Sequence, residues 1–281
     1  MNAWLTESAL DRVEEARTDA LWVRSLWSSP DAMVLAAQEA QVSADASGLV
    51  PRPARGDFDP EQHHLLGLVA GRPWFATAAE SGPVPLRSVM DGFGPTELQL
   101  AFTAAGLVGW HTRSRFCPNC GAATITVAAG MARRCSGCEQ EHYPRTDPAV
   151  IVAILDSSDR LLLGRQPVWP AGRHSVFAGF VEVGESLEQA VHREMAEEVG
   201  LRLHHLSYLG SQPWPFPRSL MVAFVGHADD TELTLASEEI EGARWFTRDQ
   251  LRAALDVEVT LPYAASIARR MIDSWLDGRL T

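Results

Sequence analysis

Three glutamates stand close together in the stretch GFVEVGESLEQAVHREMAEEVGL, residues 179–201. Glu194, Glu197 and Glu198 are spaced i, i+3 and i+4, which places their carboxylates on one face if the stretch is helical. Without a partner, such crowding of like charge is unfavourable. Clustered carboxylate oxygens suit Mg²⁺ or Mn²⁺, which keep open positions for water and phosphate oxygens. The three glutamates therefore predict a divalent cation site that could act on a diphosphate.

A solvated acidic helix face is the ordinary interpretation of such a run. The surrounding positions argue against it, because the glutamates belong to a wider frame of fixed spacing. The frame consists of Gly179, Glu185, Arg193, Glu194, Met195, Glu197, Glu198, Gly200 and Leu201. At ordinary residue usage, chance coincidence of so many positions is rare. Within the frame, we expect Arg193 to orient Glu185 through a bidentate pair rather than to contact substrate.

All four cysteines fall in one short segment, in the pattern CPNC, 14 intervening residues and CSGC. Two CxxC pairs joined by a hairpin-length segment can aim four thiolates at the corners of a tetrahedron, the geometry that Zn²⁺ accepts. The candidate ligands are Cys117, Cys120, Cys135 and Cys138. Disulfides and free thiols are the alternatives. Four protein ligands leave no open position, so we expect one structural Zn²⁺ ion and not a catalytic one.

Composition and charge limit the classes of protein that the chain can be. Its 281 residues are 46% hydrophobic and 21% charged, as in globular proteins of two or three units. The net charge of −12 gives no general attraction for nucleic acid or anionic lipid, so a phosphate-bearing ligand needs a local cation. No run of about 18 apolar residues predicts a membrane span, and the first residues do not resemble a signal peptide. We expect a cytoplasmic protein without membrane contact.

The carboxylates need a helix and a sheet to hold them. Ser186 and Gln189 form a capping-box pattern and Gly200 is a natural stop, which predicts one helix from Leu187 to Val199. Strands are predicted at AVIVAILD, RLLLGRQ, RSLMVAFVGHA and EGARWF, and helices at TRDQLRAAL and LPYAASIARRMIDSWL. These patterns indicate an α/β (α+β) fold.

Three parts of the chain differ in pattern. Residues 1–115 show short strands broken by Gly and Pro, followed by the helical stretch TELQLAFTAAGLVGWHTRS, and predict a small α/β domain. Residues 116–142 hold the cysteines. Residues 143–281 carry the glutamate frame and are expected to form the catalytic domain.

The frame fits the signature of the Nudix hydrolases at every fixed position. These enzymes cleave nucleoside diphosphates linked to another moiety. The segment SQPWPFP, residues 211–217, resembles the mark of their NAD(H) diphosphatase branch, in which a four-cysteine zinc ribbon also precedes the catalytic domain. The similarity covers residues 115–281, and the N-terminal part only by general arrangement.

The resemblance implies a Nudix fold, a mixed sheet between helices, preceded by a zinc ribbon and a smaller N-terminal domain. It implies a zinc-containing homodimer that uses Mg²⁺ or Mn²⁺, with two or more ions, to hydrolyse NADH or NAD⁺ to nicotinamide mononucleotide and AMP. Removal of NAD caps from RNA 5′ ends stays open as a further reaction.

The resemblance also implies site residues by matching positions. Metal ligands would be Glu194, Glu198, Glu239 and the backbone carbonyl of Ala178, with Glu197 as a third helix ligand or a water-orienting group. Substrate contacts would lie near the nicotinamide end and along the substrate-binding segment: Tyr143, Phe180, Gln212, Pro213, Trp214, Pro215, Phe216, Pro217, Arg218, Ser219, Glu239 and Ala268.

Some of these assignments have alternatives. Tyr143 could be a residue of the domain junction, and Phe180 could belong to the core. Arg87 matches an N-terminal substrate contact only if one residue is inserted. Some relatives carry an acidic ligand contact between the two cysteine pairs, and this chain has none there. Any contribution of the ribbon to binding is therefore open.

The prolines of SQPWPFPRS fix their φ angles and remove N–H donors, which predicts an extended, preordered segment. On an extended backbone, Trp214 and Phe216 would point to opposite sides. We expect one ring to pack into the domain, while Gln212, Ser219 and nearby backbone groups meet the ligand.

Other patterns carry less information. His63-His64 and His204-His205 lack partners at ligand spacing and are expected to be surface histidines. The absence of GxGxxG and GxxxxGK[ST] disfavours a Rossmann dehydrogenase or a P-loop enzyme. Two other functions stay open: a Nudix hydrolase of another nucleoside diphosphate derivative such as ADP-ribose, and a non-catalytic zinc-ribbon regulator that binds nucleotides or RNA.

Overall fold

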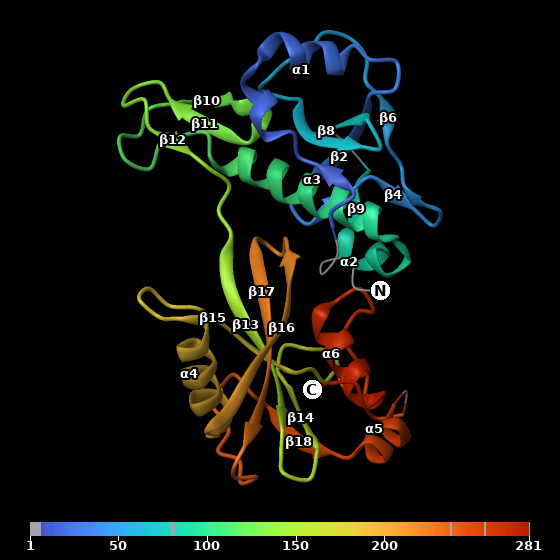
Figure 1. Cartoon of the computed structure of the whole chain (residues 1–281), viewed down its shortest axis with the longest axis vertical. Helices are drawn as coiled ribbons and strands as arrows, with labels where there is room; N and C mark the ends of the chain where they lie inside the picture. The colour runs from blue at the N-terminus through green and yellow to red at the C-terminus, as the bar shows by residue number, and fades with distance from the viewer. Residues whose placement is uncertain (1–6, 80–81, 237, 256, 281) are drawn as a thin grey trace. The chain divides into compact units, whose positions relative to one another are not determined.

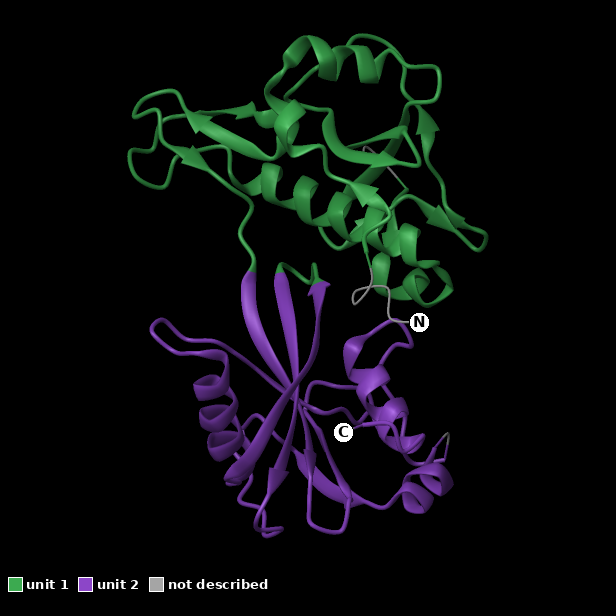
Figure 2. Ribbon diagram, viewed as in Figure 1, with its two compact units in different colours: residues 1–146, 214–218 green, residues 147–213, 219–281 purple. Residues whose placement is uncertain are grey.

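The computed structural model describes residues 7–280 apart from 80–81, 237 and 256 (Figure 1). The chain divides into two compact units, which Figure 2 shows in different colours. The first unit contains the chain up to Thr146 and the short segment Trp214–Arg218. The second contains Asp147–Pro213 and Ser219–Thr281.

A seven-stranded sheet forms most of the first unit, in the order β1-β7-β8-β2-β3-β9 with β6 beside β2. Its strands are β1 (Leu10–Asp11), β2 (Met33–Gln38), β3 (Gln41–Val42), β6 (Arg52–Pro53), β7 (His64–Val69), β8 (Arg72–Ala78) and β9 (Val84–Pro85). A separate hairpin joins β4 (Ala44–Asp45) and β5 (Gly48–Leu49). The α-helices of this unit are α1 (Ala20–Trp27), α2 (Leu86–Val89) and α3 (Pro95–Arg113).

Helix α3 is the long helix of this unit and packs against β2 and β8. It begins at Pro95, where the missing N–H is tolerated because the first turn has no intrahelical acceptor for it. The Glu97 side chain accepts a hydrogen bond from the Gly94 N–H at 3.0 Å and satisfies one of the remaining donors. The helix predicted at TELQLAFTAAGLVGWHTRS is confirmed.

The cysteine segment forms a three-stranded sheet of β10 (Thr124–Val127), β11 (Ala132–Cys135) and β12 (Glu141–His142). Arg133 of β11 is buried, and its guanidinium donates a hydrogen bond to Nδ1 of His111, in α3, at 3.0 Å. The His64 ring stacks on His111 with centroids 3.7 Å apart. Burial lowers the pKa of His64 to about 2. The expectation that His64 is a surface residue was therefore wrong, since it packs inside the first unit.

A six-stranded mixed sheet forms the centre of the second unit, in the order β16-β17-β13-β14-β18 with β15 beside β13. Its strands are β13 (Asp147–Leu155), β14 (Leu161–Arg165), β15 (Phe177–Phe180), β16 (Leu203–Trp214), β17 (Ser219–Ala228) and β18 (Gly242–Phe246). β13 and β17 run parallel, from Asp147 opposite Ser219 to Leu155 opposite His227. The helices are α4 (Leu187–Val199), α5 (Arg248–Ala254) and α6 (Ile267–Leu276).

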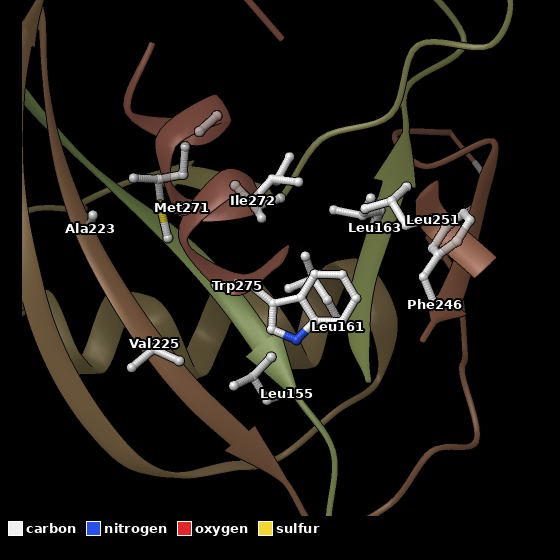
Figure 3. Close-up of a cluster of buried hydrophobic side chains, with 14 of the residues drawn as sticks. Leu155, Leu161, Leu163, Ala223, Val225, Phe246, Leu251, Met271, Ile272 and Trp275 are labelled. Atoms are coloured by element: carbon white, nitrogen blue, oxygen red, sulfur yellow. The ribbon is translucent and has the colours of Figure 1, made fainter. Parts of the chain in front are cut away.

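Alternation along β13 explains why helices cover both faces of this sheet. Ile151, Ala153 and Leu155 join a buried cluster with Trp275 of α6 and other side chains of α5 and α6 (Figure 3). The intervening residues of β13 join a second cluster with Val191 and neighbouring side chains of α4. Successive residues of a strand point to opposite faces, so one continuous apolar run serves both layers. The predicted mixed sheet between helices is confirmed.

Replacement of Trp275 by alanine should lower the free energy of unfolding of the second unit by about 3–5 kcal/mol. The indole is fully buried, and its Nε1–H donates to the carbonyl of Asp159 at 3.1 Å, so the change leaves both a cavity and an unpaired acceptor. Urea unfolding checks the value. Val257→Ala, at a side chain 85% exposed, should change it by less than about 0.5 kcal/mol. A loss for Trp275→Ala as small as that of Val257→Ala would contradict this account of the core.

Candidate active site and structural metal centre

Helix α4 begins and ends as its sequence predicts. The Ser186 side chain accepts from the Gln189 N–H at 3.1 Å, and the Gln189 side chain accepts from the Ser186 N–H at 2.8 Å. Gly200 ends the helix in the left-handed region, with φ of 73°, where a Cβ would be strained. The predicted helix Leu187–Val199 is therefore confirmed to the residue.

Arg193 holds the polar face of α4 together. Its guanidinium donates to both oxygens of Glu185, at 2.6 and 2.9 Å, in the predicted bidentate pair. It also donates to Glu194 at 2.9 Å, to Glu197 at 3.1 Å and to the carbonyl of Phe180 at 2.9 Å. The hydrogen bonds from Arg193 lower the pKa of Glu185 to about 2. One cation thus connects three carboxylates with the end of β15 and partly offsets their repulsion.

Gly179 is fixed by the close approach of β15 to α4. A Cβ at this position would lie 1.9 Å from the carboxyl carbon of Glu194, so any other residue would push this carboxylate away from its place beside Arg193. Residue 179 pairs with Val150 of β13, so the strand cannot move away without breaking the sheet. The glycine of the frame therefore allows the strand and the carboxylate to lie together.

Glu198 lies at the centre of the acidic group and is only 4% exposed. Its Oε2 atom accepts no hydrogen bond from any residue that the structure describes. Burial, reinforced by Glu194, Glu239 and Glu197, raises its pKa to about 8. A buried carboxylate without a partner is costly unless a cation or proton compensates. This oxygen-rich, electron-donating group fits a hard divalent cation.

A small cavity of about 50 Å³ adjoins Glu198. Ala178, Ser175 and Ile240 line it, together with Arg165 and Trp169 from the end of β14 and the turn after it. The expected carbonyl ligand Ala178 therefore faces the same space as Glu198. Arg165, Gln166 and Trp169 were not identified from the sequence, because their relation to Glu198 depends on strand pairing rather than on spacing.

Glu239 is carried by the segment between β17 and β18. The N–H of Ala236 donates to the carbonyl of Glu198 at 3.0 Å, and the N–H of Glu239 donates to the carbonyl of Ala236 at 2.9 Å. The charge of Glu239 contributes to the raised pKa of both Glu194 and Glu198. The structure thus brings the expected metal ligands of the second unit into one region.

The four cysteines converge more tightly. Their Sγ atoms all lie within 4.8 Å of one another, the only such group of metal-ligating atoms among the described residues. Two of the separations are 3.7 Å, for Cys117 and Cys138, and 3.4 Å, for Cys120 and Cys135. A tetrahedron with Zn–S bonds of about 2.3 Å has S–S edges of about 3.8 Å. The segment is therefore arranged for a zinc ion with no open position.

Backbone donors prepare these thiols for a metal. The N–H groups of Gly137 and Cys138 point at Cys135 Sγ, at 3.3 and 3.4 Å, and lower the pKa of Cys135 to about 6. Thiolates are the form that binds zinc. Free cysteines and disulfides, the other possibilities for this pattern, would not require this convergence.

The substrate-binding segment differs from its expected form. Gln212 is fully buried, and its side chain accepts from the Ile267 N–H at 2.6 Å and donates to the Ala265 carbonyl at 2.8 Å. Its amide therefore braces the start of α6, and both of its polar atoms have partners there. Ser219 and Ala268 are also buried, with exposures of 8% and 7%.

Trp214 and Phe216 do not point to opposite sides. Their ring centroids lie 4.8 Å apart, and each packs edge-on against Phe102, at 6.3 and 6.1 Å. The expectation was wrong because Pro215–Arg218 form a turn between β16 and β17, so the backbone is not extended there. The Arg87 guanidinium lies 4.5 Å from the Phe216 ring centre and 5.8 Å from that of Trp214. The structure thus joins Arg87 to this aromatic pair within the first unit.

The two other expected aromatic contacts are exposed. Tyr143 is 63% exposed, and its hydroxyl donates to Glu141 at 2.9 Å. Phe180 is 56% exposed at the end of β15, where its carbonyl accepts from Arg193. Neither ring belongs to a core, which removes the alternative given for Phe180. Large exposed rings are available for stacking on a planar ligand.

Comparison with known proteins gives the class of this chain. Residues 145–267 match the family model described as "NUDIX domain", and residues 112–143 match "NADH pyrophosphatase zinc ribbon domain". Together with 39% identity over 96% of the chain to a curated relative, these matches show that the chain belongs to the Nudix hydrolases that carry this zinc ribbon.

The similar proteins have related names. The "NAD-capped RNA hydrolase NudC" of Mycobacterium bovis (strain BCG / Pasteur 1173P2) is 39% identical over 295 residues, with 96% of this chain and 94% of that protein covered. The protein of the same name from Mycobacterium tuberculosis (strain ATCC 25618 / H37Rv) gives the same values. Human "NAD-capped RNA hydrolase NUDT12" is 39% identical over 65% of this chain and 44% of its own length. Within the described part of this chain, no helix is long and apolar enough to cross a membrane.

Glu198→Gln should make the protein more stable than the wild type above pH 8 when no magnesium or manganese is present. The pKa of this glutamate rises from an ordinary 4.5 to about 8 in the folded state, so its contribution to stability is full below pH 4.5 and is lost as the pH rises through 8. Glutamine cannot ionise, and the gain should be on the order of 5 kcal/mol above pH 8 and should vanish near pH 4.5. Urea unfolding at both pH values measures it.

The exposed Glu188 of the same helix supplies the control for this experiment. Glu188→Gln should leave the pH dependence of stability as it is in the wild type. A Glu198→Gln protein that is no more stable than the wild type above pH 8 would show that the buried carboxylate is already compensated.

Cys135→Ser should abolish the binding of one zinc ion per chain and lower the melting temperature of the first unit, because three thiolates cannot close the tetrahedral site. Elemental analysis of the purified protein measures the zinc content. Ser136→Ala, in the same turn, removes only a hydrogen bond to the carbonyl of Ala123 and should retain the metal. Full zinc content in Cys135→Ser would overturn the assignment of this centre.

Proposed function

We propose that this protein is a metal-dependent hydrolase of the diphosphate of NADH and NAD⁺, which releases nicotinamide mononucleotide and AMP, and that it also removes NAD caps from RNA. The observation that carries the proposal is the complete carboxylate face of α4, with the unpartnered oxygen of Glu198 at its centre. The names of the similar proteins from Mycobacterium support the choice of substrate.

Magnesium or manganese ions, bound by Glu194, Glu198, Glu239 and the carbonyl of Ala178, would polarise the diphosphate and activate water. The residues of the chain provide the frame for this chemistry. Arg193 holds Glu185, Glu194 and Glu197 in place, so that the carboxylates are ordered before a ligand binds. Burial keeps bulk water from the Glu198 carboxylate and strengthens its interaction with a cation.

The reaction is a displacement at phosphorus. The oxygen of water forms a new P–O bond while the bridging P–O bond breaks, the bridging oxygen leaves with the other mononucleotide, and the proton of water is released. For an NAD-capped RNA, the same cleavage leaves nicotinamide mononucleotide and an RNA with a 5′-monophosphate. Because the chain carries a net charge of −12, the metal ions would supply the positive charge that the phosphates need.

Substrate contacts are proposed for each unit by itself, on the family resemblance. In the first unit Tyr143 offers an exposed ring, and in the second unit Phe180 does so. In the segment from Gln212 to Ser219, the rings of Trp214 and Phe216 and the guanidinium of Arg87 form one cluster, which could provide a stacking surface with a cation. The side chain of Gln212 contributes indirectly, since it fixes the start of α6. Assembly as a homodimer is proposed on the family resemblance.

The purified protein mixed with NADH and Mn²⁺ should yield AMP and reduced nicotinamide mononucleotide, which chromatography separates. Glu198→Gln should lower kcat by orders of magnitude while the fold survives, because a neutral amide binds a divalent cation poorly. Glu188→Gln is the matched control and should retain wild-type turnover. Absence of both products with Mg²⁺ and with Mn²⁺ would sink the proposal, and cleavage of ADP-ribose alone would redirect it to another nucleoside diphosphate derivative. Competition of NADH with NAD-capped RNA then ranks the two substrates by kcat/KM.

A further inference from the structure

The segment that carries Glu239, residues 231–241, is attached to the sheet and to α4 at separate places. Near its start, the N–H of Thr234 donates to the carbonyl of Val199 at 3.0 Å, and the N–H of Ala236 donates to that of Glu198 at 3.0 Å. These two bonds use carbonyls at the carboxyl end of α4, which have no partner within the helix. The first half of the segment is therefore fixed by backbone contacts to the metal helix itself.

The far end of the segment is attached to β14 by an ion pair. Arg165 Nε donates to Glu241 Oε2 at 2.6 Å, and Nη2 lies 2.6 Å from the same oxygen. The N–H of Glu241 donates to the carbonyl of Arg165 at 2.9 Å, and Gly242 then pairs with Arg165 in the sheet. The Arg165 side chain is only 18% exposed. The Glu241 side chain is 52% exposed, so water screens the pair in part, and the pair contributes a defined geometry more than a large stabilisation.

Glu239 lies between these two attachments. The N–H groups of Glu239 and Ile240 both donate to the carbonyl of Ala236, at 2.9 and 2.8 Å, in a tight turn. Ile240 is 4% exposed and lines the cavity beside Glu198, together with Arg165. Glu239 therefore belongs to a turn, and the two residues that follow it are held in place: Ile240 lines the cavity and Glu241 contacts Arg165.

Electrostatics explains why such an attachment is needed. Glu239 adds a carboxylate to a region that already holds Glu194 and Glu198, and like charges near one another repel unless a cation lies between them. The backbone contacts of Thr234 and Ala236 precede Glu239 and do not restrain the residues after it. After Glu239, the buried side chain of Ile240 and the backbone bond from Glu241 to Arg165 hold the chain, and the Arg165–Glu241 pair adds a side-chain contact on that side.

We propose that Arg165 and Glu241 are positioning residues, which hold the segment 231–241 so that Glu239 can complete a metal site with Glu194 and Glu198. The proposal rests on the metal ligands given under the proposed function. Neither residue touches the metal or the substrate. Their role is to keep Glu239 near the other two carboxylates despite like charge, so that little ordering is needed when the ion binds.

Manganese binding, followed by electron paramagnetic resonance of free Mn²⁺ in titrations of the zinc-loaded protein, tests the proposal without turnover. The titration of Glu239→Gln comes first, because the Mn²⁺ ion whose affinity falls in this variant is the one that Glu239 helps to bind. Arg165→Gln and Glu241→Gln should each weaken binding of that ion by about tenfold, a usual effect of losing a partner outside the ligand set. The control is Arg244→Gln, on the neighbouring strand β18. This change removes a surface ion pair with Glu258, at 3.0 Å, and should leave Mn²⁺ binding unchanged.

A double-mutant cycle separates positioning from other roles. In the Glu239→Gln background, adding Arg165→Gln should cause no further loss of Mn²⁺ affinity, because there is no carboxylate left to position. Additive losses would overturn the proposal. So would wild-type Mn²⁺ affinity in Arg165→Gln combined with a raised KM, which would make Arg165 a substrate contact. Glu241 is half exposed, so Glu241→Gln keeps the test valid if Arg165→Gln fails to fold. Failure to hydrolyse NADH would refute the proposed function and leave this binding test unaffected.

Discussion

The arrangement of the candidate active site depends on the guanidinium group of Arg193. Glu185, Glu194, Glu197 and Glu198 lie at the polar face of α4. Without a positive charge among them they would repel one another, and the contact between α4 and the end of β15 would weaken. The guanidinium reaches three of them and a backbone carbonyl at the same time. Lysine could not do this, since it offers a point charge and no planar set of donors. The chain has in fact no lysine, and all 24 of its basic residues are arginine.

The two candidate metal centres achieve order in different ways. The cysteines converge on two short CxxC turns, and backbone N–H groups point at one of the sulfurs. The carboxylates of α4 are linked through Arg193 of the same helix, and among the described residues they do not form a group as tight as the four cysteines. A centre of the first kind is suited to a resident structural ion. A centre of the second kind is suited to ions that arrive with a phosphate and exchange.

Much of this arrangement could be predicted from the sequence, and the limits have physical causes. The capping box at Ser186, the stop at Gly200 and the CxxC spacing are local signals, so the helix and the cysteine centre followed directly from them. The burial of Gln212 and His64 depends on which distant elements pack on them, α6 for one and α3 for the other. The turn at Pro215–Arg218 brought two rings together that an extended chain would separate. The relation of Arg165 to Glu241 required the pairing of β14 with β18, which no local pattern gives.

The hairpin of β16 and β17 has a consequence for modularity. Its strands belong to the second unit and its turn to the first, so the chain passes between the units three times, after Thr146, Pro213 and Arg218. A fragment beginning at Asp147 would therefore expose the rings of Trp214 and Phe216, whose packing partner Phe102 lies far upstream. A cut after Thr146 would separate these rings from α3, so the border between the compact units does not mark a segment that can be removed with all its packing intact.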